Sequence, residues 1–495
     1  MTVGRLSLGS LASLPPDVAR PAYNIVAARV GVVHLGIGAF HRAHQAVYID
    51  DRLAAGETGW AICGASLRSP DTSKALEPQD GLYSVAVRSG AGERLRVIGS
   101  VRRLVVAPSD PEALLAAMSD PAVRIVSLTV TEKGYCHDPA TGALREDHPD
   151  IAADLKTPLS PRSAPGFLVE ALRRRRDAGD KPFTVLCCDN LPANGRTVAG
   201  VVRRLAELRD PALAGWIAER AAFPSTMVDR IVPGTTEADR DAVSRRLGVA
   251  DAWPVMAEPF TQWVVEDRFC DGRPRLEDAG AEMVGDVAPY ELMKLRLLNG
   301  SHSTLAYLGY LAGYETVSDT VADPAFARLI RRLMDEEVTP TLTLPPGADL
   351  SGYKSSLVER FANPALKHRT WQIAMDGSQK LPQRLLGTIR DRLDAGAPIE
   401  RLALGVAAWM RYVLGIDEAG RPIDVRDPLA ARLTEIAQAV GPDAGRLAPA
   451  LFEVREVFGG DLPGDPRFAG PVTAALGRLF AAGAKRTVAE AAARP

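Results

Sequence analysis

The chain has 495 residues, of which 46% are hydrophobic and 24% charged, proportions that are ordinary for a soluble globular protein. The formal net charge of -2 gives no reason to expect nucleic acid or an anionic membrane as a partner, and no apolar run approaches the roughly 20 residues of a membrane span. A chain of this length exceeds one ordinary hydrophobic core, so we expect two domains.

The N-terminal stretch and the cysteines favour a cytoplasmic location. Residues 1–21 lack a sustained hydrophobic segment followed by a small-residue cleavage site, so we expect no secretory signal. The five cysteines are odd in number and show no CxxC spacing, which predicts reduced thiols rather than a disulfide framework. Cys187 and Cys188 lie in an apolar run and are expected to be small core residues.

Short strand patterns alternate with helical patterns in the first half of the chain. Brief apolar runs rich in valine and isoleucine predict four buried strands, at 31–38, 60–67, 123–130 and 183–190. Helical patterns at 111–119 and 166–176 lie between them. This alternation predicts an α/β fold, with a Rossmann-like, doubly wound parallel sheet that carries helices on both faces.

The pattern changes after the turn-rich segment 266–283. From Pro289 onward the sequence is almost wholly helical, interrupted by proline and glycine clusters such as "LPPGADLSGY". We therefore predict a domain boundary near residue 285. The domains would be a Rossmann-like domain at 1–285 and a mainly α-helical domain at 286–495.

The first predicted strand runs directly into Gly36-x-Gly38 and then into a helix. In a dinucleotide-binding turn the first glycine permits the tight bend, and the second lets backbone N–H groups approach the pyrophosphate. The third glycine of that fingerprint is replaced by His41, so an ordinary strand-to-helix turn is an equal alternative. Arg42 could face a phosphate. His41 and His44 lack a third ligand of suitable spacing, so polar residues on a first helical turn are the plainer interpretation.

The end of the second predicted strand leaves the choice between NAD and NADP open. An acidic residue there normally binds the ribose hydroxyls of NAD, whereas an arginine accommodates the 2′-phosphate of NADP. This sequence offers Arg68 and Ser69 first and Asp71 further on. Asp71 could equally cap the next helix.

A second group of polar residues lies in "KLRLLNGSHSTLAYLGY", residues 294–310. Leucines at helical intervals predict a helix that begins near Pro289. At about 100° per residue, Lys294, Asn299 and His302 fall within an arc of roughly 140°, with Glu291 one turn earlier. They can therefore face one cavity. The alternative is a surface lysine, a helix-breaking Asn-Gly pair and a core histidine.

Alcohol oxidation by a nicotinamide cofactor needs such residues. A base must take the hydroxyl proton, and donors must stabilise the charge that develops on the oxygen. A partly desolvated lysine can serve as the base, and amides supply neutral donors. No HExxH motif or Cys/His cluster of ligand spacing occurs, so we expect no metal.

The sequence resembles the polyol-specific long-chain dehydrogenases and reductases, the family of mannitol 2-dehydrogenase, arabinitol dehydrogenase and fructuronate reductase. The resemblance covers nearly the whole chain and is carried by "GIGAFHRAHQ", "SLTVTEKGY", "CDNLPANG", "TMVDRIVP", "KLRLLNGSHS" and "DGSQKLPQR". It implies an N-terminal dinucleotide-binding domain, a helical substrate domain, NAD as the cofactor and a metal-independent reaction.

The resemblance also implies roles for the polar residues. Lys294 matches the general acid or base, Asn190 and Asn299 match the donors to the reacting oxygen, and His302 matches a residue that helps to hold it. Glu291 matches a carboxylate that passes the lysine proton toward water.

Further matches complete the implied site. Glu132 corresponds to a second proton-relay carboxylate, and Asp229 and Lys380 correspond to positions that line the polyol site. Gly36, Gly38 and Phe40 correspond to the cofactor-binding turn of the family. Arg42 and Asp71 are further candidate cofactor contacts, because they follow the first and second predicted strands.

One position departs from the mannitol dehydrogenase pattern. Gln372 stands where an arginine is expected, eight residues before Lys380, and offers an amide in place of a charged fork. The amino-acid sequences of the other motifs most resemble the fructuronate reductase branch of the family. The substrate of that branch bears a carboxylate at the end far from the ketone. Lys380, Arg230 and Arg369 are candidate cations for that carboxylate.

The sequence therefore predicts a cytoplasmic, NAD-linked oxidoreductase that interconverts D-fructuronate and D-mannonate. The alternatives are a mannitol 2-dehydrogenase, a broader polyol dehydrogenase that accepts arabinitol, and a dinucleotide-binding sensor without turnover. We expect a small sugar acid or polyol as the only partner, with no nucleic acid and no membrane, and a monomer because no assembly signature is present.

Overall fold

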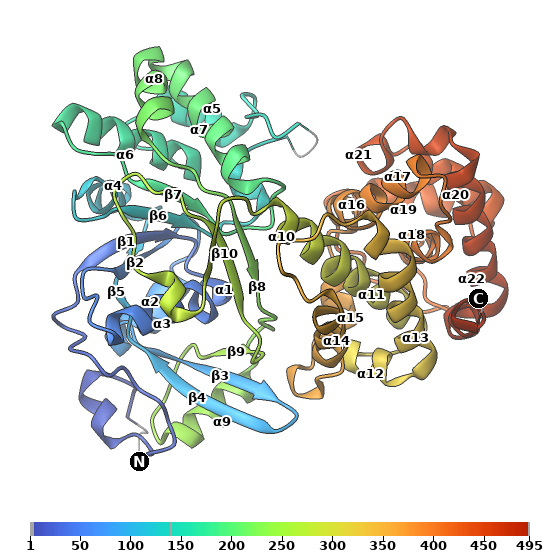
Figure 1. Ribbon diagram of the computed structural model, residues 1–495, viewed down its shortest axis with the longest axis horizontal. Coiled ribbons are helices and arrows are strands. Elements are labelled where there is room, and N and C mark those ends of the chain that lie inside the picture. The colour runs from blue at the N-terminus through green and yellow to red at the C-terminus, as the bar shows by residue number, and fades with distance from the viewer. Residues whose placement is uncertain (1–3, 139–140, 494–495) are drawn as a thin grey trace. The chain divides into compact units, whose positions relative to one another are not determined.

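The computed structural model describes residues 4–138 and 141–493, and the chain divides into two compact units, Met1–Ala288 and Pro289–Pro495. Figure 1 shows strands and helices mixed in the first unit and helices alone in the second. The α/β class and the helical C-terminal part predicted from the sequence are confirmed.

A parallel five-stranded sheet forms the centre of the first unit. Its strand order is β5-β2-β1-β6-β7, and every neighbouring pair is parallel. The strands are β1 (Val30–Leu35), β2 (Ala61–Ser66), β5 (Val101–Val106), β6 (Ile125–Leu128) and β7 (Thr184–Cys187). The strand order reverses between β1 and β6, and in open α/β sheets ligands bind beyond the carboxyl ends of the strands at such a point.

Apolar residues on both faces explain why these runs become buried strands. Val33, Leu35 and Val126 face a core formed with α4 (Pro111–Ser119), α6 (Ala164–Ala178) and α7 (Asn194–Arg209). Val32 and Ile125 face a second core formed with α2 (Gln45–Ala54) and the small sheets. Strands that are covered on both faces read as continuous apolar runs, which is why the sequence revealed them.

Two small three-stranded sheets complete the strands of the first unit. Their orders are β4-β3-β9 and β11-β10-β8. The strands are β3 (Tyr83–Ser89), β4 (Gly92–Ile98), β8 (Thr226–Asp229), β9 (Val255–Ala257), β10 (Gln262–Glu266) and β11 (Glu282–Val284). The remaining helices are α1 (Ala39–Ala43), α3 (Asp71–Leu76), α5 (Pro149–Lys156), α8 (Pro211–Arg220) and α9 (Glu237–Leu247), with short 3-10 turns η1 (Leu8–Ser13), η2 (Glu77–Gln79), η3 (Glu132–Tyr135) and η4 (Leu276–Ala279).

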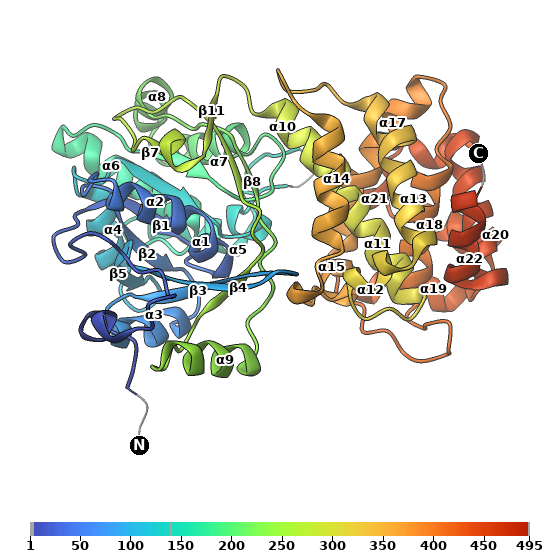
Figure 2. The same ribbon diagram turned by 60° about the horizontal axis from the view of Figure 1, so that its bottom comes forward.

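The second unit is a helical bundle around one large core (Figure 2). Its first half contains α10 (Ala288–Met293, which spans the junction), η5 (Lys294–Gly300), α11 (Ser301–Leu311), α12 (Val317–Ala322), α13 (Pro324–Arg332), η6 (Leu333–Val338), η7 (Thr339–Thr341), α14 (Leu350–Phe361) and η8 (Pro364–Leu366). Its second half contains α15 (Thr370–Ala374), α16 (Gly377–Leu381), η9 (Pro382–Leu386), α17 (Gly387–Asp394), α18 (Glu400–Val413), α19 (Ala430–Val440), α20 (Ala444–Phe452), α21 (Arg455–Phe458), η10 (Leu462–Gly464) and α22 (Pro466–Ala493, broken at Gly483).

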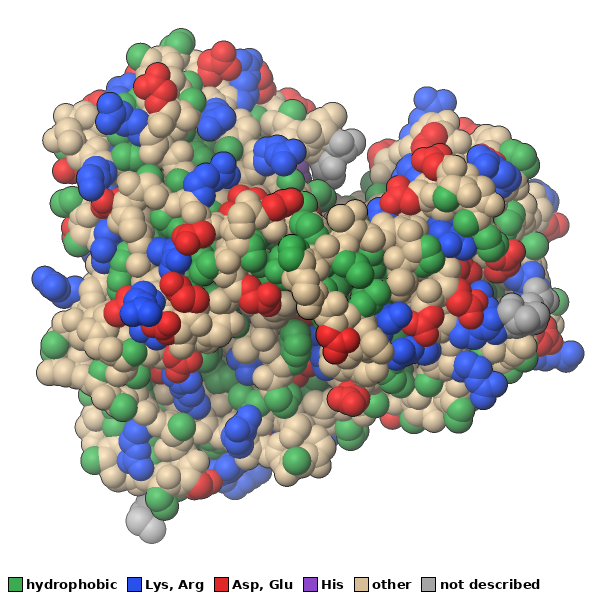
Figure 3. Space-filling view, viewed as in Figure 1, with side chains coloured by type: hydrophobic (Ala, Val, Ile, Leu, Met, Phe, Trp, Pro, Cys, Tyr) green, Lys and Arg blue, Asp and Glu red, His purple; other side chains and the backbone are tan. Residues whose placement is uncertain are grey.

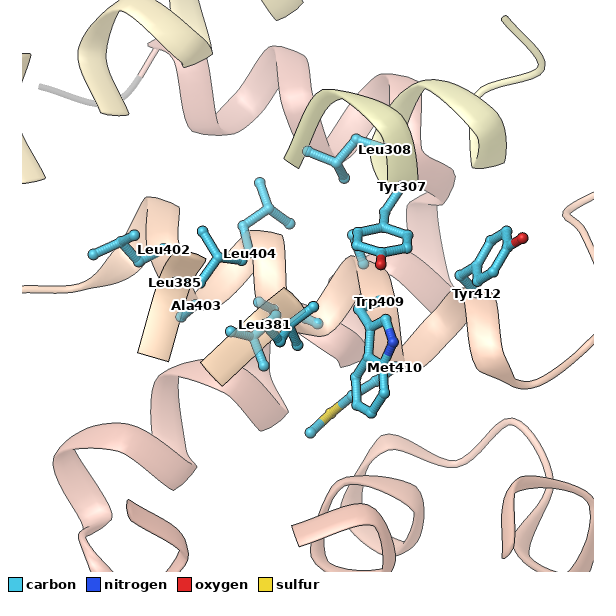
Figure 4. Packing of buried hydrophobic residues seen from close by; sticks show 14 of the residues in the cluster. Tyr307, Leu308, Leu381, Leu385, Leu402, Ala403, Leu404, Trp409, Met410 and Tyr412 are labelled. Carbon is cyan, nitrogen blue, oxygen red and sulfur yellow. The ribbon is translucent and has the colours of Figure 1, made fainter. Parts of the chain in front are cut away.

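The centre of this bundle lies where α11, α16, η9 and α18 meet. Figure 4 shows Tyr307 and Leu308 of α11 on one side, with Leu381, Leu385 and Trp409 facing them. All five side chains are at most 1% exposed. The helix that carries the polar group predicted from the sequence is therefore anchored by its apolar face in the core.

Surface and thiol features agree with the composition. On the face shown in Figure 3, basic and acidic side chains are intermingled over both units. Within residues 4–138 and 141–493, no helix combines the length and the apolar character needed to cross a bilayer. All five cysteines are free, and Cys187 and Cys188 are buried core residues as predicted.

Candidate active site

The turn after β1 has the geometry that a dinucleotide requires. Gly36 has φ 94°, and a Cβ added to it would lie 2.1 Å from the carbonyl oxygen of Thr129. Only glycine fits there, because both the backbone angle and the neighbouring strand exclude a side chain. Gly38 precedes α1, and the atom nearest to an added Cβ is 3.8 Å away. The backbone is thus open to close approach at the second glycine, as a bound pyrophosphate needs.

A buried histidine, His34, is hydrogen-bonded to the residues that hold this turn. The His34 ring contacts the hydroxyls of Ser127 and Thr129, each at 2.8 Å, and Thr129 donates to the carbonyl of Gly36 at 2.8 Å. His41 stacks on His34 with ring centroids 3.4 Å apart. Burial lowers the pKa of both histidines, to about 3 for His34, so both rings are neutral at physiological pH. His41 therefore fills the space beneath the turn, where the sequence lacks a third glycine.

Phe40 and His44, which follow the turn, stack on each other with ring centroids 5.0 Å apart. The His44 Nε2 atom lies 2.8 Å from the carbonyl oxygen of Gln262. His41 and His44 thus have different neighbours, in agreement with the interpretation that they are not a metal pair.

Two residues expected to contact the cofactor, Arg42 and Asp71, have very different surroundings in the structure. Arg42 is 1% exposed, and its guanidinium donates to the carbonyl of Trp253 at 2.6 Å and lies over the Tyr83 ring. These contacts hold Arg42 in the interior of the first unit, and its expected contact with a phosphate stays a prediction. Asp71 is exposed and is the first residue of α3, while Pro70 occupies the cap position, so the capping role considered for Asp71 is wrong.

Three predicted residues follow strand ends of the first unit. Glu132 begins η3 after β6, Asn190 follows β7, and Asp229 is the last residue of β8. Because β6 and β7 are parallel neighbours, their carboxyl ends place Glu132 and Asn190 on the same edge of the sheet as the glycine turn. Asp229 is 3% exposed, whereas Asn190 is exposed.

A residue that the sequence analysis did not single out joins these strand ends. The Asn194 amide donates to the carbonyls of Cys187 and Thr226, at 3.2 and 2.9 Å, and accepts from the backbone N–H of Thr226 at 2.9 Å. Asn194 thereby ties the end of β7 to the start of β8. It lies within the quoted motif "CDNLPANG", which was the available signal.

The second unit presents Lys294 and Asn299 on a π-helical segment, η5, rather than on the α-helix that the sequence suggested. In an α-helix residues five apart differ by about 140° in direction, whereas π-helical hydrogen bonds join residues i and i+5 and bring such a pair to one side. Lys294, Asn299 and His302 are 7–8% exposed. The π turn therefore gathers the lysine and the amide more closely than the predicted arc.

Gly300 does not break this helix but lets another segment pack closely against it. Its φ of −64° and ψ of −50° are helical, and an added Cβ would lie 2.9 Å from the carbonyl oxygen of Arg384 in η9. The Arg384 guanidinium donates to the hydroxyl of Ser303 at 3.0 Å. Two motifs far apart in the chain, "KLRLLNGSHS" and "DGSQKLPQR", are thus in contact.

His302 lies in an apolar and cationic environment. Its ring stacks on Phe361, with centroids 5.3 Å apart, and meets the His368 ring edge-on at 4.9 Å. Burial first, and then electrostatic interactions with His368, Arg384, Arg360 and Lys380, lower the pKa of His302 far below its usual value. Among the described residues its Nε2 atom has no hydrogen-bond partner. A neutral ring with one unused nitrogen suits contact with a substrate hydroxyl.

The three candidate cations for a substrate carboxylate have different surroundings. The Lys380 Nζ donates to the carbonyls of Met375 and Ile373, at 2.5 and 3.3 Å. Arg230 donates to the carbonyls of Glu258 and Ala43 inside the first unit. Arg369 is half exposed and lies 3.8 Å from the Glu315 carboxylate. Only Lys380, of the three, is close enough to affect His302. Gln372, in α15, is half-buried.

One group of potential metal ligands occurs within the described residues, at Cys136, His148 and Asp150. The His148 Nδ1 atom accepts a hydrogen bond from the backbone N–H of Asp150 at 3.2 Å, which uses the lone pair of the imidazole at the start of α5. Burial raises the pKa of the Cys136 thiol to about 12, which disfavours the thiolate that a metal needs. We therefore assign no metal to this group, and the expected absence of metal stays a prediction.

The sequence matches known proteins over both units. The mannitol dehydrogenase Rossmann domain matches residues 30–278, and the mannitol dehydrogenase C-terminal domain matches residues 286–480. The chain belongs to the mannitol dehydrogenase family. Members of this family similar to it include the D-mannonate oxidoreductase of Escherichia coli, which is 49% identical over 95% of this chain and 98% of that protein.

Two further mannitol dehydrogenase relatives give a comparison. The mannitol 2-dehydrogenase of Aspergillus fumigatus is 42% identical over 93% of each chain. The Pseudomonas fluorescens mannitol 2-dehydrogenase, solved as a ternary complex with NAD and D-mannitol, is 40% identical and superimposes with a TM-score of 0.93 over 99% of this chain and 100% of that one. The family resemblance and the oxidoreductase class predicted from the sequence are confirmed.

Proposed function

We propose that this member of the mannitol dehydrogenase family is an NAD-linked oxidoreductase that interconverts D-mannonate and D-fructuronate. The observation that carries the proposal is the buried set of Lys294, Asn299 and His302 on and beside the π turn, in contact with the segment that holds Lys380. The higher identity to D-mannonate oxidoreductase than to the mannitol 2-dehydrogenase above supports the choice of substrate.

In this proposal Lys294 transfers the proton of the reacting hydroxyl. During oxidation the neutral Lys294 amine takes that proton while the carbon loses hydride, and during reduction the ammonium returns it. The glycine turn at Gly36 and Gly38 would hold NAD, which would supply the hydride acceptor for oxidation. Asn190 and Asn299 donate to the oxygen, where negative charge develops, and the neutral His302 ring fixes its direction.

Two carboxylates complete the proton path in this proposal. Glu291 lies on α10, one turn before Lys294, and Glu132 lies at the sheet edge of the first unit. Both are half-buried, an exposure that suits carboxylates that exchange protons with water.

The proposed substrate differs from the mannitol pair at its far end. Fructuronate and fructose share a ketone beside a terminal hydroxymethyl group, so the same reacting groups serve both. We assign the distal carboxylate to the neighbourhood of Lys380, because of the three candidate cations only Lys380 is close enough to His302 to lower the pKa of that histidine. Gln372 would then offer an uncharged amide to a substrate hydroxyl.

A substrate panel tests the assignment. Purified full-length protein is given NADH with D-fructuronate or D-fructose, and NAD with D-mannonate, D-mannitol or D-arabinitol. We expect kcat/KM for fructuronate to exceed that for fructose by at least about tenfold, because one charged contact is worth that much. A preference for fructose would replace this proposal with mannitol 2-dehydrogenase, and cofactor binding without any turnover would indicate a sensor.

The same panel repeated with NADPH tests the cofactor. We propose NAD, as in the solved mannitol 2-dehydrogenase complex. The exposed Arg68 after β2 is the feature that would favour NADP, and a higher kcat/KM with NADPH would assign it to a 2′-phosphate.

A further inference from the structure

The backbone immediately before Glu132 is strained. Thr131 has φ 64° and ψ 163°, a region that almost only glycine occupies, although threonine is β-branched. Among the six non-glycine residues with positive φ in the described chain, it is the one with an extended ψ that directly precedes a proposed site residue. Such strain persists only where the surroundings fix the conformation, and it concentrates at functional sites.

A single carboxylate, that of Asp189, holds this turn. Asp189 accepts from the backbone N–H groups of Val130 and Thr131, at 2.8 and 3.2 Å, and from the hydroxyl of Tyr135 at 2.7 Å. These donors precede and follow Glu132, so the carboxylate fixes the turn on both sides. Gly134 completes the bend, since an added Cβ would lie 2.7 Å from a methyl of Val130.

The position of Asp189 in the chain links two parts of the proposed site. It follows β7 and directly precedes Asn190, whereas the turn that it holds follows the neighbouring strand β6. The three hydrogen bonds to Asp189, called the Asp189 clamp below, therefore join the loop that carries Asn190 to the loop that carries Glu132. Neither loop could shift alone without breaking hydrogen bonds to a desolvated carboxylate, which is costly.

We propose that Asp189 is a positioning residue that keeps the strained Thr131 turn in place and thereby sets the Glu132 carboxylate for proton transfer. This inference rests on the proposed function, because it takes Glu132 as a relay group.

The donors around Asp189 support the inference. An ionised carboxylate accepts hydrogen bonds and donates none, which matches three donors, whereas a protonated carboxyl would bring a fourth proton that needs an acceptor. Burial raises the pKa of Asp189 to about 7, against the hydrogen bonds from Tyr135 and Val130, which lower it. The titratable groups around it are Tyr135, Glu132, Cys187 and Cys188.

The first experiment compares Asp189→Asn with Thr131→Gly and the double variant, using the substrate that the panel selects. An amide presents N–H groups to a site built from donors, so Asp189→Asn should lower kcat roughly 10- to 100-fold with little change in KM for NADH. Thr131→Gly alone should keep kcat within about twofold, because glycine adopts the same angles without strain. In the Thr131→Gly background the loss from Asp189→Asn should be at least about fivefold smaller, because the turn no longer needs the clamp.

The coupling decides between positioning and a general structural role. If the two substitutions simply multiply, or if Asp189→Asn keeps wild-type kcat, the inference is wrong. On a Glu132→Gln background, Asp189→Asn should add little further loss and should not change the pH profile again. If Asp189→Asn does not fold, Tyr135→Phe removes one donor and leaves the carboxylate, and the same coupling to Thr131→Gly is required of it.

Hydrogen exchange separates this inference from the choice of substrate. Exchange of the amides of Val130 and Thr131 should rise in Asp189→Asn, whichever substrate the enzyme uses. Unchanged exchange would overturn the clamp even if fructuronate is the substrate. A protein that turns over only fructose would overturn the proposed function, while the coupling measured with fructose would still decide the role of Asp189.

Discussion

At the scale of single residues, the protein arranges neutral and charged groups for separate tasks. His302 and His368 meet edge-on in a buried region, and burial keeps both imidazoles neutral. Lys294 and Asn299 are equally buried a few residues earlier. A neutral ring can direct a hydroxyl without adding a second proton donor, so in the proposed mechanism the proton transfer is left to the lysine.

Replacement of the lysine tests that division. Lys294→Ala should lower kcat roughly 10²- to 10⁴-fold, because it removes the group that exchanges a proton with the substrate. The Kd for NADH, measured by fluorescence titration, should change little, because the residue acts on the reacting oxygen. Lys181→Ala, at a lysine whose side chain is 73% exposed, is the matched control and should leave both quantities unchanged. Near-normal turnover of Lys294→Ala would remove this residue from the mechanism.

The buried histidines also predict how stability depends on pH. Burial lowers the pKa of His368 to about 4 from 6.5, so between these values the unfolded chain binds a proton that the folded protein does not. Stability from this residue is therefore complete above about pH 6.5 and is lost as the pH falls toward 4. By calorimetry, the Tm of wild type relative to His368→Gln should fall between pH 7.5 and pH 5, and a constant difference would contradict the neutral ring. The contributions of the other titrating groups cancel in this difference in Tm, because both proteins carry those groups.

At the scale of elements, two π-helical segments shape the helix that carries Lys294 and Asn299. The π turn η5 brings Lys294 and Asn299 to one side, and η9 packs against it at Gly300. π turns are rare and are often found at functional sites. The close packing of backbone against backbone at Gly300 explains why an Asn-Gly pair occurs inside a helix, where glycine is otherwise unfavourable.

Glycine-to-alanine substitutions in two helices test this packing. Gly300→Ala places a methyl 2.9 Å from the carbonyl of Arg384, and it should destabilise the protein by about 1–3 kcal/mol and lower kcat by displacing Asn299. Gly470→Ala in α22 is the control. An added Cβ there meets nothing within 4 Å, so this substitution should be neutral or stabilising by up to about 1 kcal/mol. If Gly300→Ala and Gly470→Ala changed Tm equally, the close contact between Gly300 and Arg384 would not be the cause of the loss of stability.

At the scale of the whole molecule, the residues with proposed roles belong to two units. The glycine turn, Glu132 and Asn190 follow strands of one parallel sheet in Met1–Ala288, and Lys294, Asn299 and His302 belong to Pro289–Pro495. In the sequence these residues extend from Gly36 to His302. Each unit brings its own set together through its own core.

Cofactor binding should depend on the first unit. Gly36→Ala combines a φ of 94° with a clash at 2.1 Å, and it should weaken NADH binding by at least about 100-fold because the turn cannot form. Gly56→Ala is the matched control: its φ is 97°, but an added Cβ meets nothing within 4 Å. It should cost stability and leave the Kd for NADH within about threefold of wild type. Similar losses of affinity in both variants would mean that general strain, and not the turn, is responsible.

Much of the architecture and the family could be predicted from local patterns. Continuous apolar runs predicted the strands β1, β2, β6 and β7, because a sheet covered on both faces needs such residues. The ordered motifs around Gly36, Asn190, Lys294 and Lys380 were enough to recognise the family, because each is short and contiguous. For the roles of single site residues, the sequence provides predictions that the kinetic experiments above will test.

Only the tertiary structure decided which neighbours each residue meets. Spacing alone suggested an α-helix at Lys294 and a phosphate contact for Arg42, but packing against η9 accompanies a π turn, and Trp253 holds Arg42 in the interior. The clamp by Asp189 on Thr131 joins residues 58 positions apart. Such contacts depend on the register of neighbouring strands and helices, which arises from long-range packing and leaves no periodic trace in the amino-acid sequence.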